Sequence, residues 1–415
     1  METGLFGLER ETKVRQSRVR ECFTPHIPID NERLFMGRQA QVAGAIEALN
    51  TPGQHMIVFG ERGVGKSSLA RVSCQLLLKK LVSGELHQRR CDSDDTFHTV
   101  WLEILQEYGY EGVPTESNQT RKEGGQAGLK IPVAEAGVKT EKEQHVKTIR
   151  DQFRPLSPSV VARFLQDKEG LILIDEIDAL ASTADRQRMA QVVKHLSDAD
   201  SQVKVLLVGV ASAAAELTDG HPSVQRCLRE IRLDPMDRDE IRSIIVTGSQ
   251  MSRIVFTGDV TKSIVDLAAG YPYFAQLLGL KCAEEAAGND LTTVDQRVFQ
   301  AALKSAVTDA DATLQRCYSE AVRSAGTEMY SQLVQCAAEL PPTEFTAAAL
   351  REALSQQLER RVEQSEIMYS IQKLVGNDDS RLFRRLQRGV YRFSDPRMRC
   401  YIRMAATGRS TSLPG

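Results

Sequence analysis

The chain has 415 residues, of which 41% are hydrophobic and 26% charged, and its formal net charge at pH 7 is −2. This length predicts two or three domains with ordinary soluble cores, and the nearly neutral charge gives no overall attraction to nucleic acid or to a membrane surface. No apolar run approaches the roughly 20 residues that a membrane-spanning helix needs. Eight scattered cysteines without metal-ligand spacing indicate buried, unpaired thiols in a reducing cytoplasm.

The N-terminal segment, residues 1–22, is charged throughout, lacks the apolar stretch of a signal peptide, and is expected to add little to the core. The prolines Pro25 and Pro28 favour an extended chain after it. A helix is predicted over residues 39–49, because Val42, Ile46 and Leu49 recur at helical spacing.

The most specific motif is GERGVGKS at residues 60–67, which fits the P-loop pattern at every constrained position. An apolar run precedes it as a predicted strand, and a predicted helix follows. Glycines let the main chain approach a phosphate, and amides at a helix N-terminus favour an anion. Lys66 is expected to reach the β and γ phosphates of ATP, and the Ser67 hydroxyl to bind Mg²⁺. The residues expected to contact the nucleotide here are Gly60, Glu61, Arg62, Gly63, Val64, Gly65, Lys66, Ser67 and Ser68.

The middle of the first half contains further strand signals. Residues 99–104 alternate between apolar and polar side chains, which predicts a second strand, whereas residues 115–145 are polar and glycine-rich and favour a mobile insertion. The aliphatic runs 171–174 and 203–210 are typical of parallel strands covered on both faces. Strands that alternate with helices predict an α/β doubly wound parallel sheet over residues 23–234.

Two carboxylates, Asp175 and Glu176, follow the run 171–174 directly. Ligands bind at the carboxyl ends of strands in such sheets. Asp175 is therefore expected to hold Mg²⁺, directly or through water, and Glu176 to polarise the water that attacks the γ phosphate. The alternative is an acidic strand end that only faces solvent, which the upstream P-loop makes the weaker interpretation.

Past Pro235 the strand signals stop and helices dominate. Asp237 with Glu240, and Thr293 with Gln296, have the spacing of helix-capping pairs. A small helical lid domain is predicted over residues 235–305.

Residues 306–405 are predicted to form a winged-helix-like domain, followed by a tail over 406–415. Helices are expected at 327–339, 347–358 and 365–375, with two short strands on either side of Arg388 and Gly389. The stretch 381–403 holds eight arginines against a single acid, Asp395. These arginines either contact duplex DNA phosphates or pair with acids elsewhere in a domain that contacts protein. They are Arg381, Arg384, Arg385, Arg388, Arg392, Arg397, Arg399 and Arg403.

The P-loop, the Asp-Glu strand end, a third core strand and the following helices together resemble the AAA+ ATPases, in the branch of origin-recognition-like and STAND-type ATPases. The resemblance covers residues 23–305 and extends into the C-terminal part. Residues 23–38 are similar to the family's N-linker, and residues 208–212 to its sensor-1 strand, which implies that Ser212 contacts the γ phosphate or the water. The Gly270-Tyr271-Pro272 segment resembles the Gly-x-Pro element of STAND proteins, which implies that Pro272 packs near the adenine.

The same resemblance implies an arginine finger after the sensor strand, with Arg226 the first choice and Arg229 and Arg232 behind it. An ordinary solvated helix face is the alternative. No arginine stands near Gly270 in the place where many AAA+ motors have their sensor-2 residue. That departure favours a slow nucleotide-controlled switch over a fully coupled motor.

The sequence and the resemblance thus predict an ATPase that binds ATP or ADP with Mg²⁺ and changes either its conformation or its assembly state with nucleotide, the second by forming homo-oligomers. Two outputs are open: association with double-stranded DNA, or exposure of a surface for a protein effector without DNA. A scaffold that binds nucleotide without hydrolysing it is a third hypothesis, which the intact Asp175 and Glu176 pair argues against.

Overall fold

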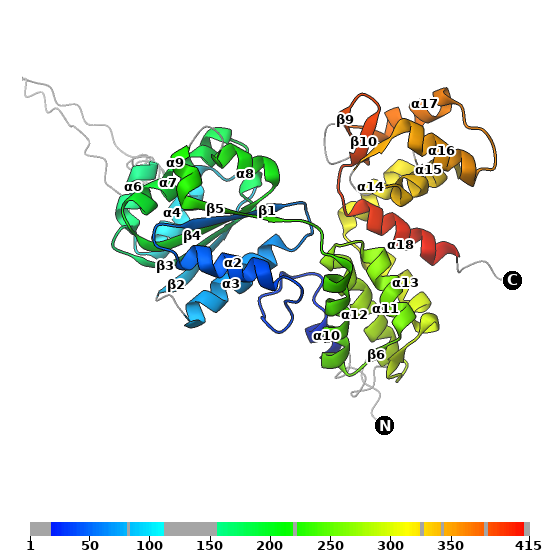
Figure 1. Ribbon diagram of the computed structural model, residues 1–415, viewed down its shortest axis with the longest axis horizontal. Helices are drawn as coiled ribbons and strands as arrows, with labels where there is room; N and C mark the ends of the chain where they lie inside the picture. The colour runs from blue at the N-terminus through cyan, green and yellow to red at the C-terminus, as the bar shows by residue number, and fades with distance from the viewer. Residues whose placement is uncertain are drawn as a thin grey trace, which may run out of the picture.

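A parallel sheet forms the centre of the N-terminal part of the computed structural model (Figure 1), which describes residues 18–80, 84–111, 156–218, 222–323, 328–341, 344–376 and 381–410. Five strands follow the order β2-β3-β4-β1-β5. Their bounds are β1 (His55–Gly60), β2 (Glu85–Arg90), β3 (Glu169–Asp175), β4 (Gln202–Gly209) and β5 (Leu228–Leu233). Parallel pairing sets Phe59 beside Gly209 and Arg90 beside Asp175, so the segments that follow β1, β2, β3 and β4 meet at one edge.

Helices cover both faces of this sheet (Figure 1). Side chains of a strand alternate between faces, and accordingly Met56 and Val58 lie in one buried cluster while Ile57 lies in the other. The first face carries α2 (Gln39–Asn50) and α3 (Lys66–Lys80). The opposite face carries α4 (Phe97–Glu107), α6 (Pro158–Leu165), α7 (Thr183–Asp198), α8 (Ala211–Thr218) and α9 (Pro222–Cys227). The doubly wound α/β core is thereby confirmed.

The strand predicted over residues 99–104 is wrong, because this segment lies inside helix α4. Its buried side chains Phe97, Val100, Trp101 and Ile104 recur at intervals of three and four residues, which is helical spacing. Thr96 caps the helix through a capping box with Thr99. The second strand is instead β2, a polar edge strand that the sequence pattern did not reveal.

The helical part after the sheet comprises α10 (Arg238–Ser252), α11 (Gly258–Ala268), α12 (Pro272–Gly288) and α13 (Gln296–Asp309), with the short parallel strands β6 (Val255–Phe256) and β7 (Thr293–Val294). The capping box of Asp237 and Glu240 is present as predicted. The capping role predicted for Thr293 is wrong, because Thr293 lies in β7 and Asp295 caps α13. The predicted domain limit at residue 305 falls within α13.

The N-linker joins this helical part to the sheet. Phe23 is only 1% exposed and fits against two glycines, since a Cβ placed on Gly248 or Gly279 would lie 2.1 Å or 2.4 Å from its ring. Further along, the Ile29 amide donates to Ser68 Oγ at 3.0 Å. Residues 18–22 contribute the buried Val19 and Cys22 and so add more to the core than expected, while the rest of the predicted segment 1–22 lies outside the described residues.

The C-terminal part has helices around an antiparallel sheet of order β8-β10-β9, as expected for a winged-helix-like arrangement. Its elements are α14 (Ala312–Arg323), α15 (Glu328–Glu339), β8 (Phe345–Thr346), α16 (Ala347–Gln357), α17 (Gln364–Leu374), β9 (Phe383–Gln387), β10 (Val390–Phe393) and α18 (Met398–Ser410). Helix α18 takes up part of the stretch predicted as a tail.

Three further observations bear on the sequence-based expectations. All eight cysteines are buried and free, as predicted. Within the described ranges, no helix is long and apolar enough to cross a bilayer. The segment 115–145, predicted to be a mobile insertion, lies outside the described residues.

Candidate nucleotide site

The P-loop follows β1 and leads straight into α3. Its three glycines have positive φ angles, +156° at Gly60, +84° at Gly63 and +98° at Gly65. At Gly60 the main chain runs so close to β5 that a Cβ would lie 2.2 Å from the Leu233 carbonyl oxygen. Lys66 Nζ donates to the carbonyl oxygens of Gly60, at 3.0 Å, and Glu61, at 2.9 Å. The lysine ammonium therefore lies across the mouth of the loop.

The acidic segment after β3 lies beside this loop. Burial raises the pKa of Asp175, and a hydrogen bond from the Ser67 hydroxyl acts in the opposite direction. Burial lowers the pKa of Lys66, while the charges of Asp178 and Asp175 counteract that effect. The structure thus brings Lys66, Ser67 and Asp175 together at the carboxyl edge of the sheet, although nearly 110 residues separate Lys66 from Asp175 in the chain.

Glu176 has a fixed position at the same edge. Its main chain is left-handed, with φ +56°, and its amide donates to Asp175 Oδ1 at 2.9 Å. Its carboxylate accepts a charged hydrogen bond of 2.7 Å from Arg90, the last residue of β2. The carboxylate is therefore held toward β2, and Arg90 is a contact that sequence reasoning missed.

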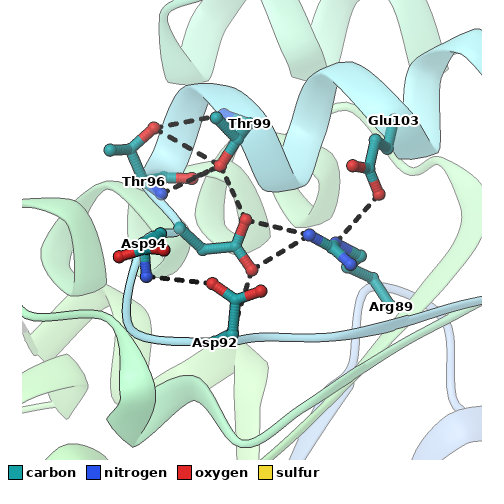
Figure 2. A network of polar contacts seen from close by, with 7 residues as sticks. Arg89, Asp92, Asp94, Thr96, Thr99 and Glu103 are labelled. Atoms are coloured by element: carbon teal, nitrogen blue, oxygen red, sulfur yellow. Dashed lines mark hydrogen bonds and ion pairs between the residues drawn. The ribbon is translucent and has the colours of Figure 1, made fainter.

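A polar network fixes the segment that carries Arg90 (Figure 2). Arg89 donates to both carboxylate oxygens of Asp95, at 2.9 Å and 3.0 Å, and Asp95 also accepts from the Thr99 hydroxyl and the Asp92 amide. Burial alone would raise the pKa of Asp95, but these hydrogen bonds and Arg89 outweigh it and lower that pKa. Arg89 and Arg90 are successive residues of a strand, so their side chains leave in opposite directions, one into this network and one to Glu176.

The other predicted site residues have varied positions. Ser212 is exposed in the first turn of α8, just past the carboxyl end of β4. Pro272 opens α12 and lies on the P-loop, with its Cγ 3.7 Å from a Cβ placed on Gly65. Arg226 lies just before β5, at the opposite edge of the sheet from its own P-loop, and pairs with Asp198 at 3.0 Å. Within the P-loop, Glu61 and Arg62 are exposed and Val64 is buried.

Three contacts from outside the sheet reach the P-loop, and no local sequence pattern predicted them. Arg38, only 4% exposed, donates to the Asp234 carbonyl at 2.6 Å and lies 3.5 Å from the Val64 carbonyl. The Tyr271 hydroxyl donates to Glu61 Oε2 at 2.7 Å. Arg397 lies against the loop, with its Cδ 2.6 Å from a Cβ placed on Gly63.

The arrangement fits a bound nucleoside polyphosphate. A side chain on Gly60 or Gly63 would collide with its neighbours, whereas glycine leaves main-chain amides accessible at the start of α3. Ser67 and Asp175 supply hydroxyl and carboxylate oxygens, the ligand types that Mg²⁺ prefers when phosphate oxygens complete its shell. Among the described residues no group of three or more His, Cys, Asp or Glu side chains is placed to hold a metal.

Six of the eight arginines of residues 381–403 fall into two groups, and the other two, Arg384 and Arg392, are half-buried. Arg397 is buried between Asp395 and Asp311, Arg399 donates to the Ala338 carbonyl, and Arg403 pairs with Glu339. These three side chains fix α18 to the rest of the C-terminal part. The exposed group lies on or beside the β9–β10 hairpin and consists of Arg381, Arg385 and Arg388.

The comparisons with known proteins agree with this geometry. The model of the family described as Novel STAND NTPase 1 matches residues 27–384. The structure of Aeropyrum pernix ORC2 in its ADPNP-ADP complexes is 13% identical, covers 94% of this chain and 98% of its own, and has a TM-score of 0.51, which supports a shared fold. No curated protein matches.

Two further solved structures are similar at lower TM-scores. Aeropyrum pernix ORC1, solved in complex with DNA, is 17% identical, covers 93% of this chain and 96% of its own, and has a TM-score of 0.47. CDC6P from Pyrobaculum aerophilum is 14% identical, covers 94% of this chain and 98% of its own, and has a TM-score of 0.45.

Proposed function

Because the chain belongs to the novel STAND NTPase 1 family, we propose that it binds ATP with Mg²⁺, hydrolyses it slowly to ADP and phosphate, and changes conformation with the nucleotide. The observation that carries this proposal is the convergence of Lys66, Ser67 and Asp175 at the carboxyl edge of the sheet. Three groups that the motif requires lie together there, and two of them come from one loop and the third from another strand.

Each residue has a part in that chemistry. The amides of residues 64–67 bind phosphate oxygens, and Lys66 moves from the Gly60 and Glu61 carbonyls to the β and γ phosphates. Ser67 and Asp175 hold magnesium, which neutralises charge on the phosphates when it is bound. Glu176 accepts a proton from the attacking water once its carboxylate is free of Arg90.

Nucleotide-dependent switching is supported by what surrounds the loop. Tyr271 and Pro272 reach it from the lid, and Arg397 reaches it from the C-terminal part. A ligand on the P-loop therefore contacts, or displaces, side chains from three parts of the chain. Differential contact of this kind is what a ligand needs in order to shift a conformational equilibrium.

For the output of the switch we favour a protein effector over duplex DNA. The family match is to STAND NTPases. Arg397, Arg399 and Arg403 are held by internal contacts, so fewer arginines are available for phosphates than the sequence suggested. Duplex DNA binding through the β9–β10 hairpin is the alternative.

The test of the proposal is a pair of substitutions. Lys66→Ala should abolish measurable binding of a fluorescent ATP analogue, because the loop loses its only ammonium group. Glu176→Gln should bind as wild type but lose turnover by about two orders of magnitude or more, in line with the loss of a general base.

Lys79→Ala is the matched control, because Lys79 is an exposed lysine of the same helix α3. It should bind and turn over as wild type. Normal ATP binding by Lys66→Ala would show that the P-loop assignment is wrong.

A further inference from the structure

A buried tyrosine hydroxyl group makes the polar contact between the lid and the P-loop. Tyr271 is 7% exposed, and its hydroxyl donates to Glu61 Oε2 at 2.7 Å. Burial, and then the neighbouring Glu61 carboxylate, raise the pKa of Tyr271 far above its ordinary value. The hydroxyl therefore keeps its proton and remains a donor at any physiological pH.

The turn that carries Tyr271 has little freedom. Gly270 has φ +91°, and a Cβ there would lie 2.7 Å from Pro235 Cβ. The Met236 amide donates to the Gly270 carbonyl at 2.9 Å, and the Tyr271 amide donates to Ala268 at 2.8 Å. Residues 235–236 are the connection between the sheet and the lid, so the direction of the Tyr271 side chain is set at the hinge itself.

Glu61 has two partners that matter for the nucleotide. Its carbonyl oxygen accepts from Lys66 Nζ at 2.9 Å, and its carboxylate accepts from Tyr271. One residue of the loop thus contacts the nucleotide-binding lysine through its main chain and the lid through its side chain. Pro272, the next residue of the lid, lies over Gly65 at the other end of the loop.

We propose that Tyr271 is a positioning residue of the nucleotide site, which couples the P-loop to the lid by donating its hydroxyl hydrogen bond to Glu61. The inference rests on the proposed nucleotide function and adds a specific coupling residue to it. The hydrogen bond holds the lid closed on the loop, so it slows the release of a bound nucleotide. It also supplies a lid contact in a sequence without an arginine at the expected sensor-2 position beside Gly270.

Release of a fluorescent ADP analogue, measured by stopped flow, tests this coupling. Tyr271→Phe keeps the ring and removes only the hydroxyl, and Glu61→Ala removes the acceptor from the exposed side. Each should release ADP about tenfold faster than wild type, the effect typical of one hydrogen bond to a charged group. The double variant should be no faster than either single one, because both remove the same interaction.

Two further variants separate positioning from general stability. Tyr273→Phe removes a hydroxyl two residues along, at the Asp311 main chain, and should release ADP as wild type does. Glu61→Gln keeps an oxygen acceptor and should release ADP more slowly than Glu61→Ala. Urea unfolding should give similar midpoints for wild type and Glu61→Ala. If Tyr271→Phe folds poorly, the release rate of Glu61→Ala alone tests the coupling.

The outcomes separate two failures. If wild type does not bind the ADP analogue, the proposed function is overturned and this inference with it. If wild type binds but Tyr271→Phe and Glu61→Ala release ADP at its rate, or the double variant shows additive effects, only the coupling role is overturned.

Discussion

Arg397 is a buried cation that is paired with two carboxylates. Its guanidinium lies 2.7 Å from Asp395 and 3.1 Å from Asp311, and its side chain is 10% exposed. Burial works against the charged form, but the two carboxylates outweigh it and raise the pKa of Arg397. The aliphatic part of the side chain packs on Gly63. Loss of any one charge of this cluster leaves a buried charge without its partner, which destabilises the fold. Protonation of these carboxylates should therefore dominate the acid sensitivity of the C-terminal part.

The sign of that sensitivity follows from Asp311. Burial alone would raise its pKa, but Arg397 and the Thr313 amide outweigh burial and hold the pKa below its ordinary 3.8. A carboxylate with a lowered folded-state pKa stabilises the fold above its ordinary pKa, and this stability is lost as the pH falls through 3.8 toward the folded value. We therefore expect the urea concentration at the unfolding midpoint to decrease as the pH is lowered from about 5 to about 3. This range extends about one unit on either side of that ordinary pKa.

Arg397→Met should lower the free energy of unfolding at pH 7 by about 2 kcal/mol, since it leaves two half-buried carboxylates without their cation. It should also flatten the decline between about pH 5 and pH 3, because Arg397 no longer lowers the pKa of Asp311 in the folded state. Urea unfolding at several pH values measures both effects. Arg388→Met, at an exposed arginine of the hairpin, is the control and should change neither. If the stability of Arg397→Met depended on pH as that of wild type does, Arg397 would not be the cause of the acid sensitivity.

At the scale of helices and strands, the contiguous motifs predicted the correct local structure, whereas the short or polar segments did not. The P-loop and the Asp175–Glu176 strand end were predicted because each motif is contiguous and lies next to a buried strand. Helix α4 was mistaken for a strand because six residues, 99–104, are too short a window to separate alternation from helical spacing. Strand β2 escaped notice because it is an edge strand, with only His87 buried among its six residues.

The contacts that close the site could not be predicted in the same way. Tyr271, Arg397 and Arg90 reach the P-loop or Glu176 from segments distant in the chain, so no local spacing reveals them. Thr293 illustrates competition between local signals: its spacing to Gln296 is that of a cap, but pairing with Val255 across β6 and β7 prevailed, and Asp295 caps the helix. Where two local structures were possible for Thr293, the pairing of β6 with β7 determined which one formed.

Close packing of helices on Phe23 leads to a prediction about two glycines. A Cβ on Gly248 of α10 would lie 2.1 Å from the Phe23 ring, whereas a Cβ on Gly44 of α2 meets nothing within 4 Å. Gly248→Ala should therefore destabilise the protein by about 1–3 kcal/mol through overpacking. Gly44→Ala, the same change in an open helix position, should stabilise it by about 0.5–1 kcal/mol.

Thermal or urea unfolding compares the two alanine variants directly. The opposite signs are the discriminating result, because a general effect of removing a helical glycine would have the same sign at both positions. Equal stabilisation by both would mean that Phe23 does not occupy the space between α10 and α12.

Across the whole molecule, one apolar cluster runs from the α2–α3 face of the sheet through the lid into the C-terminal part. It includes Val58 of the sheet, Phe274 of the lid and Tyr401 of α18. Figure 1 shows the sheet on the left and, on the right, the lid helices below the C-terminal helices. Movement of the lid must therefore repack this cluster, which supports transmission of nucleotide occupancy over the length of the chain.

Arg226 bears on assembly, because it lies at the edge of the sheet opposite its own P-loop. It therefore reaches a γ phosphate only if that phosphate is bound to a neighbouring subunit. Its side chain is 68% exposed and paired with the half-exposed Asp198, an ion pair of little energetic value that a neighbour's phosphate can displace. We expect light scattering to give a monomer mass with ADP and a multiple of it with a slowly hydrolysed ATP analogue.

Arg226→Ala should retain ATP binding but lose turnover by about 10³-fold, the lower range for loss of an arginine finger. Arg188→Ala, at an exposed arginine of α7, is the control and should leave turnover unchanged. Repeating the mass measurement with duplex DNA separates the outputs: a mass increase that weakens steeply with salt would favour DNA over a protein effector. An unchanged monomer under every condition would exclude action between subunits, because no second P-loop would then be within reach of Arg226.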